Sequence, residues 1–574
     1  MKLNLNSNTL RWLWKVSGRY KTSVAGLLVI QIIFGLCGVA SAILFMSLID
    51  SATAKQLDVF IQVGLCIAGL FLFENLLRII NRHLHEWTSA SLENLFKERL
   101  FSVLLKKDHA TVTATHSGEW ISRLTSDVSV VTGGIIDILP GLGGMLARLG
   151  SALAALIVLE PAFLAILIPA GLFILLMTAL LRKVLKRLHK KVQEAYGAVL
   201  SFLQERLESL MIIRIFSMEQ KTCKDAAEKM KQHKAARMQR TTFSNLCNFG
   251  FGIVADGGYL LGAVYCGYGI LKGTLSYGTF TAVLQLVGQV QSPFAMLTGI
   301  IPRYFAMTAS AERLMEAEAY PDDNDGSPVE AKEVRRFYAE EFQALGVRDA
   351  VFSYRRRGKV GVTAEQLQVI DHLNFEVKKG EYVAFTGQSG SGKSTLFKLL
   401  MSLYPLDEGE RYIRSENAEY PLTAAWRGLF AYVPQGNQLI SGSIREIVAF
   451  GDQDAMQQDE RIERALQIAC ADEFVSALEL GMDTRLGERG AGLSEGQMQR
   501  IAIARAIFSD RPVLILDEST SALDEKTEQK LLCNLQRMTN KTVLLITHRP
   551  AALEICDRVI DLSSQTADAA PQTE

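Results

Sequence analysis

The stretch GQSGSGKST, from Gly387 to Thr395, decides how the second half of this 574-residue chain folds. It satisfies the pattern G-x-x-x-x-G-K-[ST] and follows the apolar run Tyr382 to Phe385, as expected where a buried strand turns through glycines into a helix. Backbone N–H groups of such a turn surround phosphate oxygens, while Lys393 reaches the β and γ phosphates and Ser394 offers its hydroxyl to Mg²⁺. The stretch therefore predicts a nucleotide site. The residues expected to contact phosphate are Gly387, Gln388, Ser389, Gly390, Ser391, Gly392, Lys393, Ser394 and Thr395.

Two neighbouring carboxylates end the downstream segment PVLILDE, which begins at Pro512. Four consecutive large apolar residues predict a strand that is buried on both faces of a parallel sheet. Asp517 would then stand at the carboxyl end of this strand, where open α/β sheets bind ligands, and could hold the metal. Because a strand alternates its side chains, we expect Glu518 to point elsewhere and to polarise the attacking water. The alternative is two solvated acids at a strand end.

Apolar residues are concentrated before about residue 310, although 49% of the whole chain is hydrophobic and 21% is charged. The segment from Val24 to Leu48 carries no charge, and its 25 residues are enough for a helix to cross a bilayer. The further predicted spans are Val59 to Ile80, Leu139 to Leu159, Pro161 to Leu181, Phe249 to Leu271 and Phe280 to Met307. We therefore expect six membrane-spanning helices.

Basic residues predict how these spans are oriented. Lys and Arg collect before the first span and after the fourth, whereas the loop from Asp50 to Asp58 and the loop near Thr274 hold one lysine each. Cytoplasmic flanks collect basic residues, so both chain ends are expected inside the cell. The sequence of residues 1–22 predicts an amphipathic helix at the membrane surface and not a signal peptide. The alternative is a disordered polar N-terminal segment.

The stretches between the spans predict the domain organisation. Long charged segments with helical spacing separate spans two and three, and spans four and five, with turns expected near Asp108 to His116 and near Ile212 to Glu219. We expect a membrane domain at 23–315, a polar linker at 316–341, an α/β nucleotide-binding domain at 342–562 and a disordered tail at 563–574. Equal totals of 61 basic and 61 acidic residues give no argument for nucleic acid, and eight scattered cysteines give none for zinc or disulfides.

Further motifs flank the phosphate loop in a characteristic order. Tyr354 precedes it, and Gln435, the LSEGQ segment that ends at Gln497, the SALD segment that ends at Asp524, and His548 follow it. This set resembles the ATP-binding cassette transporters, and the amino-terminal half resembles the exporters of that family. The resemblance covers nearly the whole chain. It implies an α-helical membrane domain with long cytoplasmic extensions, followed by an α/β P-loop nucleotide-binding domain.

The resemblance also implies roles for single residues. Tyr354 would stack on adenine, Gln435 would contact Mg²⁺ or its water, and His548 would hydrogen-bond the γ phosphate of ATP. Asp524 is also expected to contact ATP. Catalysis is assigned to Glu518, His548 and Gln435, and the metal to Ser394, Gln435 and Asp517.

The LSEGQ segment implies a partner. Ser494, Gly496 and Gln497 open a helix that is expected from Gln497 to Phe508, whose N-terminus would close over ATP held by a second subunit. Glu495 stands where the family commonly has glycine. The implied assembly is a dimer of half-transporters in a lipid bilayer, preferably a homodimer and alternatively a heterodimer, without nucleic acid.

The implied activity is ATP-driven export of a lipid, peptide or drug-like substrate from the cytoplasm across a prokaryotic cytoplasmic membrane. Two alternatives remain open, an exporter-fold importer of a siderophore-like ligand and an ATP-switched membrane regulator without cargo. Charges within spans are expensive and mark either a pathway or an ion pair. We therefore expect Arg148 and Asp256 to line a substrate cavity or to pair with one another, and Glu74 to be able to pair with Arg78.

Overall fold

The computed structural model describes residues 7–115, 117–323, 327–355, 366–388, 390–436, 439–452, 455–487, 492–538 and 540–562. Within these ranges, the side chains of residues 7, 164–168, 170–180, 182, 183, 186, 255, 294, 295, 297, 298, 301, 355 and 366 lie outside the description. The chain forms two compact units. The first contains residues 1–101 and 121–317, and the second contains residues 102–120 and 318–574.

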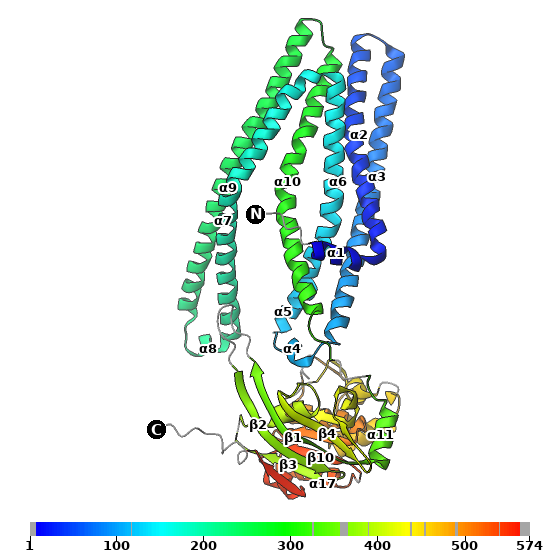
Figure 1. The fold of residues 1–574 in the computed structure, drawn as a ribbon, viewed down its shortest axis with the longest axis vertical. Helices are drawn as coiled ribbons and strands as arrows, with labels where there is room; N and C mark the ends of the chain where they lie inside the picture. Colours follow the sequence, from blue (N-terminus) through cyan, green and yellow to red (C-terminus); the bar gives the residue numbers. More distant parts are fainter. Residues whose placement is uncertain are drawn as a thin grey trace. The chain divides into compact units, whose positions relative to one another are not determined.

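The first unit is helical (Figure 1). Its elements are α1 (Ser7–Val16), α2 (Lys21–Thr53), α3 (Leu57–Leu104), a π-helical turn (Arg123–Asp127), α6 (Val128–Leu159), α7 (Leu164–Glu208), α8 (Leu210–Ile215), α9 (Glu219–Leu271) and α10 (Tyr277–Glu318). Helix α5 (Ser117–Ser122) begins in the second unit and ends in the first. Helix α2 packs along α6, and α7 packs along α9.

Small residues bring α2 and α6 together. A Cβ at Gly35 would lie 2.8 Å from the backbone nitrogen of Arg148, and one at Gly144 would lie 3.0 Å from the carbonyl oxygen of Gln31. Contacts this short leave no room for a side chain, so the two backbones approach through glycine, as in many membrane bundles. This close approach sets Gln31 against Gly144 and Gly35 against Arg148 on the neighbouring helix.

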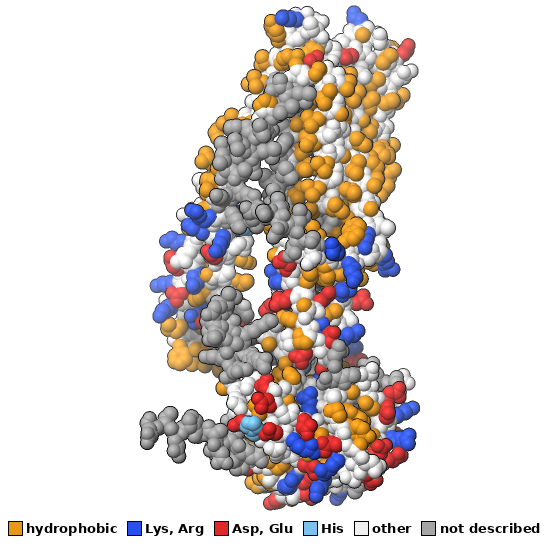
Figure 2. Space-filling view, in the orientation of Figure 1, with side chains coloured by type: hydrophobic (Ala, Val, Ile, Leu, Met, Phe, Trp, Pro, Cys, Tyr) orange, Lys and Arg blue, Asp and Glu red, His pale blue; other side chains and the backbone are white. Residues whose placement is uncertain are grey.

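Within the part of the chain that the structure describes, four helical segments are long and apolar enough to cross a membrane: Gly18–Thr53, Leu57–Leu104, Ser117–Leu159 and Glu219–Leu271. They contain the first, second, third and fifth predicted spans. Large side chains such as Leu65 (69% exposed) and Leu72 (74% exposed) on α3 are exposed, which suits lipid and not water. Figure 2 shows hydrophobic side chains gathered over the upper part of the helical unit. The fourth predicted span lies in α7, where most side chains fall outside the description, and the sixth lies in α10. The count of six spans stays a prediction.

The helices continue well beyond a bilayer and break near the predicted turns. Helix α3 has 48 residues, which is about 72 Å at 1.5 Å per residue and more than twice the ~30 Å of a hydrocarbon core. Short helices follow these breaks: α4 (His109–Thr113) after α3, and α8 between α7 and α9. His116, at the end of the first predicted turn, lies outside the described residues.

The second unit contains two main sheets. An antiparallel sheet has the order β2 (Gln366–Lys378), β1 (Phe342–Arg355), β4 (Glu408–Ser415), β5 (Glu419–Pro421). A parallel sheet has the order β11 (Arg558–Asp561), β3 (Tyr382–Thr386), β10 (Thr542–Ile546), β9 (Val513–Asp517), β6 (Phe430–Val433). The short strands β7 (Gly442–Ser443) and β8 (Arg485–Leu486) pair with each other.

Besides α4, the helices of this unit are α11 (Ala331–Glu340), α12 (Lys393–Leu400), α13 (Ile444–Val448), α14 (Asp459–Ile468), α15 (Asp472–Ser476), α16 (Glu495–Phe508), α17 (Glu525–Gln536) and α18 (Pro550–Glu554). Strands β9 and β10 are buried at every position, and Phe385 and Phe397 pack edge to face between β3 and α12. The predicted fold class, a helical membrane domain followed by an α/β nucleotide-binding domain, is confirmed. Helix α11 lies inside the segment that the sequence suggested as a linker.

Candidate nucleotide site

The phosphate loop joins β3 to α12, as the glycine pattern predicts. Gly387, Gly390 and Gly392 have φ values of 140°, 86° and 87°, which only glycine adopts readily. Gly392 is also the N-cap of α12, and a Cβ there would lie 2.8 Å from Ile370 Cδ1 and 2.9 Å from Val369 Cγ1. The loop is therefore shaped both by backbone conformation and by close packing against β2. Ser389, a predicted contact, lies outside the described residues.

Two side chains in this loop suit a phosphate ligand. Lys393 is 7% exposed, and its Nζ donates to the carbonyls of Gly387 and Gln388 at 2.7 and 2.9 Å, so the charge is held inside the loop. Ser391 Oγ is buried and has no hydrogen-bond partner among the described residues. A buried hydroxyl without a partner is unfavourable, and a phosphate oxygen would satisfy it. The residues present thus fit a bound nucleotide.

The carboxylate expected to hold the metal is fully buried at the end of β9. Asp517 accepts hydrogen bonds from Ser394 Oγ at 3.1 Å and from Tyr432 Oη at 3.0 Å. Burial raises the pKa of Asp517, and these two hydrogen bonds oppose the shift. Hard oxygen donors that converge in this way fit Mg²⁺, and Ser394 and Asp517 are the predicted pair. Sequence reasoning missed Tyr432, which precedes Gln435 by three residues on β6.

Glu518 lies just beyond the end of the strand that carries Asp517. Strand β9 ends at Asp517, and Glu518 has a φ of 48°, a left-handed conformation that is uncommon for a residue with a side chain. Strand alternation therefore does not apply to Glu518, because the strand ends one residue before it, and the separate roles of the two carboxylates stay a prediction. The Nε2 of Gln435 donates to Glu518 Oε2 at 2.7 Å, so these two predicted catalytic residues are brought together.

Tyr354 is half-buried close to the phosphate loop. Its hydroxyl lies 3.1 Å from Thr395 Oγ1, and its ring packs edge to face on Phe352 and Tyr404. Burial raises the pKa of Tyr354. The ring is thus tied to the first turn of α12, which places an aromatic side chain next to a phosphate-binding loop.

The LSEGQ and SALD segments contact one another. Helix α16 begins at Glu495, two residues before the predicted start, because Ser494 and Gln497 form a capping box. Ser494 and Glu495 are exposed, whereas a Cβ at Gly496 would lie 2.7 Å from the carbonyl oxygen of Ala522. Gly496 is therefore required for the approach of the SALD segment. Gln499, which the sequence did not single out, joins the same two segments through Ser521 Oγ at 3.3 Å and Ala522 N at 3.2 Å.

The remaining predicted residues lie at helix and strand ends. Asp524 is the exposed N-cap of α17 and accepts from Thr527 N at 3.0 Å, a hydrogen bond that lowers its pKa. His548 is exposed two residues after β10. Arg549, which sequence reasoning missed, donates to the carbonyls of Ser521 and Leu523 at 2.6 and 3.0 Å. It therefore ties the segment after β10 to the SALD segment.

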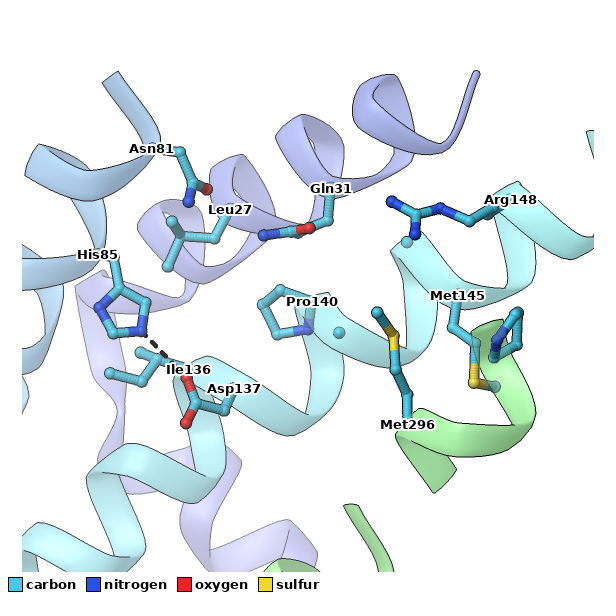
Figure 3. A pocket seen from close by; sticks show the side chains of 13 residues that line it. Leu27, Gln31, Asn81, His85, Ile136, Asp137, Pro140, Met145, Arg148 and Met296 are labelled. Atoms are coloured by element: carbon cyan, nitrogen blue, oxygen red, sulfur yellow. Dashed lines mark hydrogen bonds and ion pairs between the residues drawn. The ribbon is translucent and has the colours of Figure 1, made fainter. Parts of the chain in front are cut away.

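The helical unit contains a cavity of about 210 Å³ between α2, α3, α6 and α10 (Figure 3). Arg148 lines it, whereas Asp256 is exposed on α9 and forms no ion pair with Arg148, both residues being described. Glu74 and Arg78 do pair, at 3.7 Å.

Other polar residues of the cavity were not predicted. Figure 3 shows His85 and Asp137 at one end, 3.0 Å apart, and Arg148 at the other. Asn81 Oδ1 is buried without a partner among the described residues. Pro140 and Pro293, two prolines within helices, also line the cavity.

Known proteins match both halves of the chain. The family model of the ABC transporter transmembrane region matches residues 24–294, and the family model described as ABC transporter matches residues 370–521. The ATP-dependent lipid A-core flippase of Vibrio vulnificus (strain CMCP6) is 27% identical over 573 residues, which cover 98% of this chain and 94% of the relative. The flippase of the same name from Pseudomonas fluorescens (strain Pf0-1) is 29% identical over 514 residues, or 88% and 82%.

The fold has a solved counterpart. The structure of a bacterial Atm1-family ABC exporter with ATP bound matches with a TM-score of 0.77 at 20% identity, over 97% of this chain and 100% of that one. At this identity the likeness shows the fold alone. Together with the phosphate loop, the LSEGQ segment and the two matching family regions, it identifies an ATP-binding, membrane-embedded protein. The chain belongs to the ABC transporters, as an exporter-type half-transporter whose ATPase is coupled to membrane transport.

Proposed function

We propose that two copies of this chain form a homodimeric exporter in the cytoplasmic membrane, with both termini inside, that moves an anionic amphipathic lipid out of the cytoplasmic leaflet. The observation that carries this proposal is the cavity that Arg148 lines, because its chemistry matches a charged headgroup. ATP binding and hydrolysis by the paired second units would drive alternating access.

The arrangement of the nucleotide site supports a dimer. The phosphate loop, Asp517 and Glu518 supply one half of a site, while the exposed N-terminus of α16 offers N–H groups and a positive dipole end that suit an anion. In our proposal this helix closes over ATP on the other copy. A homodimer is preferred because each expected element of the ATP site is present in this chain, and a heterodimer is the outcome that mass measurement in mild detergent would reveal.

Within the site, the side chains would share the work of phosphoryl transfer. Ser394, Gln435 and Asp517 would hold Mg²⁺, which neutralises charge on the phosphates. Lys393 would bind phosphate oxygens, and Glu518 would take the proton of the attacking water. His548 would contact the γ phosphate, and its exposed position leaves it accessible to a ligand. Tyr354 would stack on adenine.

Cavity size and lining support a lipid headgroup. A volume of about 210 Å³ is below the ~300–1,000 Å³ of pockets that enclose whole drug-sized ligands, so the cavity suits the polar end of a larger molecule. Arg148 would pair with a phosphate or carboxylate, and the unpartnered Asn81 Oδ1 would accept from a hydroxyl or amide. Leu27, Met145 and Met296 supply apolar contacts. Relatives named as lipid A-core flippases also favour a lipid.

The test uses purified protein in liposomes with Mg²⁺ and ATP. We expect anionic lipids to stimulate ATP hydrolysis and to be moved between leaflets, and we expect Arg148→Gln to remove the stimulation. Arg82→Gln is the matched control, since Arg82 is an exposed arginine of α3 that does not line the cavity. If Arg148→Gln behaved like Arg82→Gln, the headgroup assignment would fail. Uptake instead of export, or ATPase without flux, would favour the importer or the regulator.

A further inference from the structure

The hydroxyl of Tyr432 reaches the buried carboxylate of Asp517 from a neighbouring strand. Tyr432 belongs to β6, which runs parallel to β9, and its Cα partner there is Ile515. Because side chains alternate between the faces of a strand, Asp517, two residues beyond Ile515, lies on the same face of the sheet as Tyr432. The ring packs against the hydrophobic cluster that contains Phe430 and Ile515. The pairing of the two strands therefore determines where this hydroxyl lies.

Each oxygen of the Asp517 carboxylate has its own hydroxyl partner. Ser394 Oγ donates to Oδ1 at 3.1 Å, and Tyr432 Oη donates to Oδ2 at 3.0 Å. Ser394 is the second residue of α12, directly after the phosphate loop, and is the other side chain of this pair that is expected to hold the metal. Oδ1 is therefore the oxygen on the side of the expected metal, and Oδ2 is the oxygen on the side of β6.

The hydrogen bond to Oδ2 is costly to break. Asp517 is fully buried, and a buried carboxylate that loses a partner carries the desolvation penalty of the freed oxygen. The other three residues of β6 are buried, so the strand is anchored in the core. Three residues beyond Tyr432, Gln435 donates to Glu518 at 2.7 Å, so one short segment holds two consecutive carboxylates. Oδ2 is therefore committed to Tyr432.

Metal ions differ in how they use a carboxylate. Mg²⁺ demands near-ideal octahedral geometry at about 2.0–2.1 Å and keeps several of its waters. Ca²⁺ accepts about 6–8 oxygen ligands at about 2.3–2.6 Å, and it binds carboxylates through one oxygen or through both. A carboxylate with one oxygen already bonded offers only the other oxygen to a metal. It suits Mg²⁺ and denies Ca²⁺ the two-oxygen mode of binding.

We propose that Tyr432 is a positioning residue that makes the nucleotide site selective for Mg²⁺ over Ca²⁺, because it holds Oδ2 of Asp517 and leaves only Oδ1 for the metal. The inference rests on the proposed function, in which Ser394 and Asp517 hold the metal that accompanies ATP. Tyr432 acts through Asp517 and needs no contact with ATP or with the metal. Side chains that orient a metal ligand in this way typically change metal affinity by about 10- to 100-fold.

The experiment measures equilibrium binding of the non-hydrolysable ATP analogue adenylyl imidodiphosphate to the full-length protein, with EDTA, with Mg²⁺ and with Ca²⁺. The readout is the Kd in EDTA divided by the Kd with each metal, so it needs no ATP hydrolysis. Tyr432→Phe keeps the ring and removes only the hydroxyl. We expect this variant to lower the ratio for Mg²⁺ by about 10-fold or more. We expect the ratio for Ca²⁺ to fall less than about threefold, because Asp517 can then offer both oxygens to Ca²⁺.

Tyr412→Phe is the matched control for the loss of a hydroxyl. The Tyr412 hydroxyl also donates to a carboxylate, that of Glu376, at 2.9 Å, but both residues lie on the antiparallel sheet. We expect this control to keep both ratios of the parent protein.

The inference is overturned if the Mg²⁺ ratio of Tyr432→Phe equals that of Tyr412→Phe, or if the ratios for Mg²⁺ and Ca²⁺ fall equally. It is also overturned if the affinity in EDTA falls as much as the affinity with Mg²⁺, because the phosphate loop itself would then be damaged. If Mg²⁺ does not tighten binding to the parent protein, the metal role proposed for Asp517 is rejected, and the inference with it.

Discussion

Replacing Gly496 by Ala sets two physical effects against one another at the start of α16. Alanine favours a helix over glycine by about 1 kcal/mol, which would stabilise the protein. The new Cβ, however, would lie 2.7 Å from the carbonyl oxygen of Ala522, where ordinary contact begins at 3.4 Å. The SALD segment must therefore retreat by about 0.7 Å, the difference between the two distances in the same geometry.

The retreat determines which effect wins. The SALD segment is held by Gln499 through hydrogen bonds of 3.3 and 3.2 Å, which are already long and would break. Losing two hydrogen bonds costs about 2 kcal/mol, so we expect a net loss of about 1 kcal/mol. For a unit of this size, that corresponds to a Tm lower by about 2–4 °C. Displacement of LSEGQ against SALD should also slow ATP hydrolysis about 10- to 100-fold.

The assay is thermal unfolding followed by intrinsic fluorescence, together with ATPase turnover in liposomes. Gly197→Ala is the matched control, because Gly197 is an exposed helical glycine of α7 whose Cβ would meet nothing within 4 Å. We expect this control to stabilise slightly and to hydrolyse ATP normally. A rise in Tm and normal turnover for Gly496→Ala would refute the reasoning. The SALD segment would then have moved without losing its hydrogen bonds to Gln499.

Two further predictions concern the catalytic carboxylate and the loop around α4. Glu518→Gln should retain ATP affinity and lose turnover, because the amide still accepts a hydrogen bond from Gln435 but cannot take a proton. Equilibrium binding measures the affinity and phosphate release measures the turnover. Hydrolysis by the variant at the wild-type rate would contradict the prediction. Burial lowers the pKa of His109, with the charges of Lys398 and Arg427 acting in the same direction and those of Asp108 and Asp323 against it. As the pH falls below the free value of about 6.5, His109 takes up a proton more readily when the loop around α4 is released than when it is packed beside Tyr404. The packing of this loop beside Tyr404 should therefore weaken toward acid pH. Amide exchange of α4 between pH 7 and 5 should show this opening after correction for intrinsic rates, and His109→Gln should be insensitive to pH.

Local patterns carried the predictions that were confirmed. Glycines with positive φ, a lysine and a serine at set spacing require a strand, a turn and a helix within a few residues, so the phosphate loop is readable from neighbouring positions. The apolar run before Asp517 indicates a buried parallel strand for the same reason. Long apolar segments likewise indicate membrane helices, because their length and composition suffice.

Contacts between residues that are distant in the chain could not be predicted from local sequence patterns. Glu518 has a left-handed conformation where the chain leaves β9 beside β10, and there its N–H donates to the carbonyl of Ile546 at 3.0 Å. The hydrogen bond from the Tyr432 hydroxyl to Asp517 joins residues 85 positions apart in the chain, and no local spacing in the sequence predicts it. The cavity lined by Arg148 likewise needs four helices to meet.

The sequence by itself determined the family, the order of the membrane and nucleotide-binding halves, and the residues of the phosphate loop, because each is encoded in short segments whose backbone and burial follow from their own residues. Only the tertiary structure decided that residues 102–120 join the second unit, that Gly496 must lack a side chain, and that Arg148 and Asp256 are apart. These features depend on which surfaces finally pack together, and side-chain packing is a property of the whole fold.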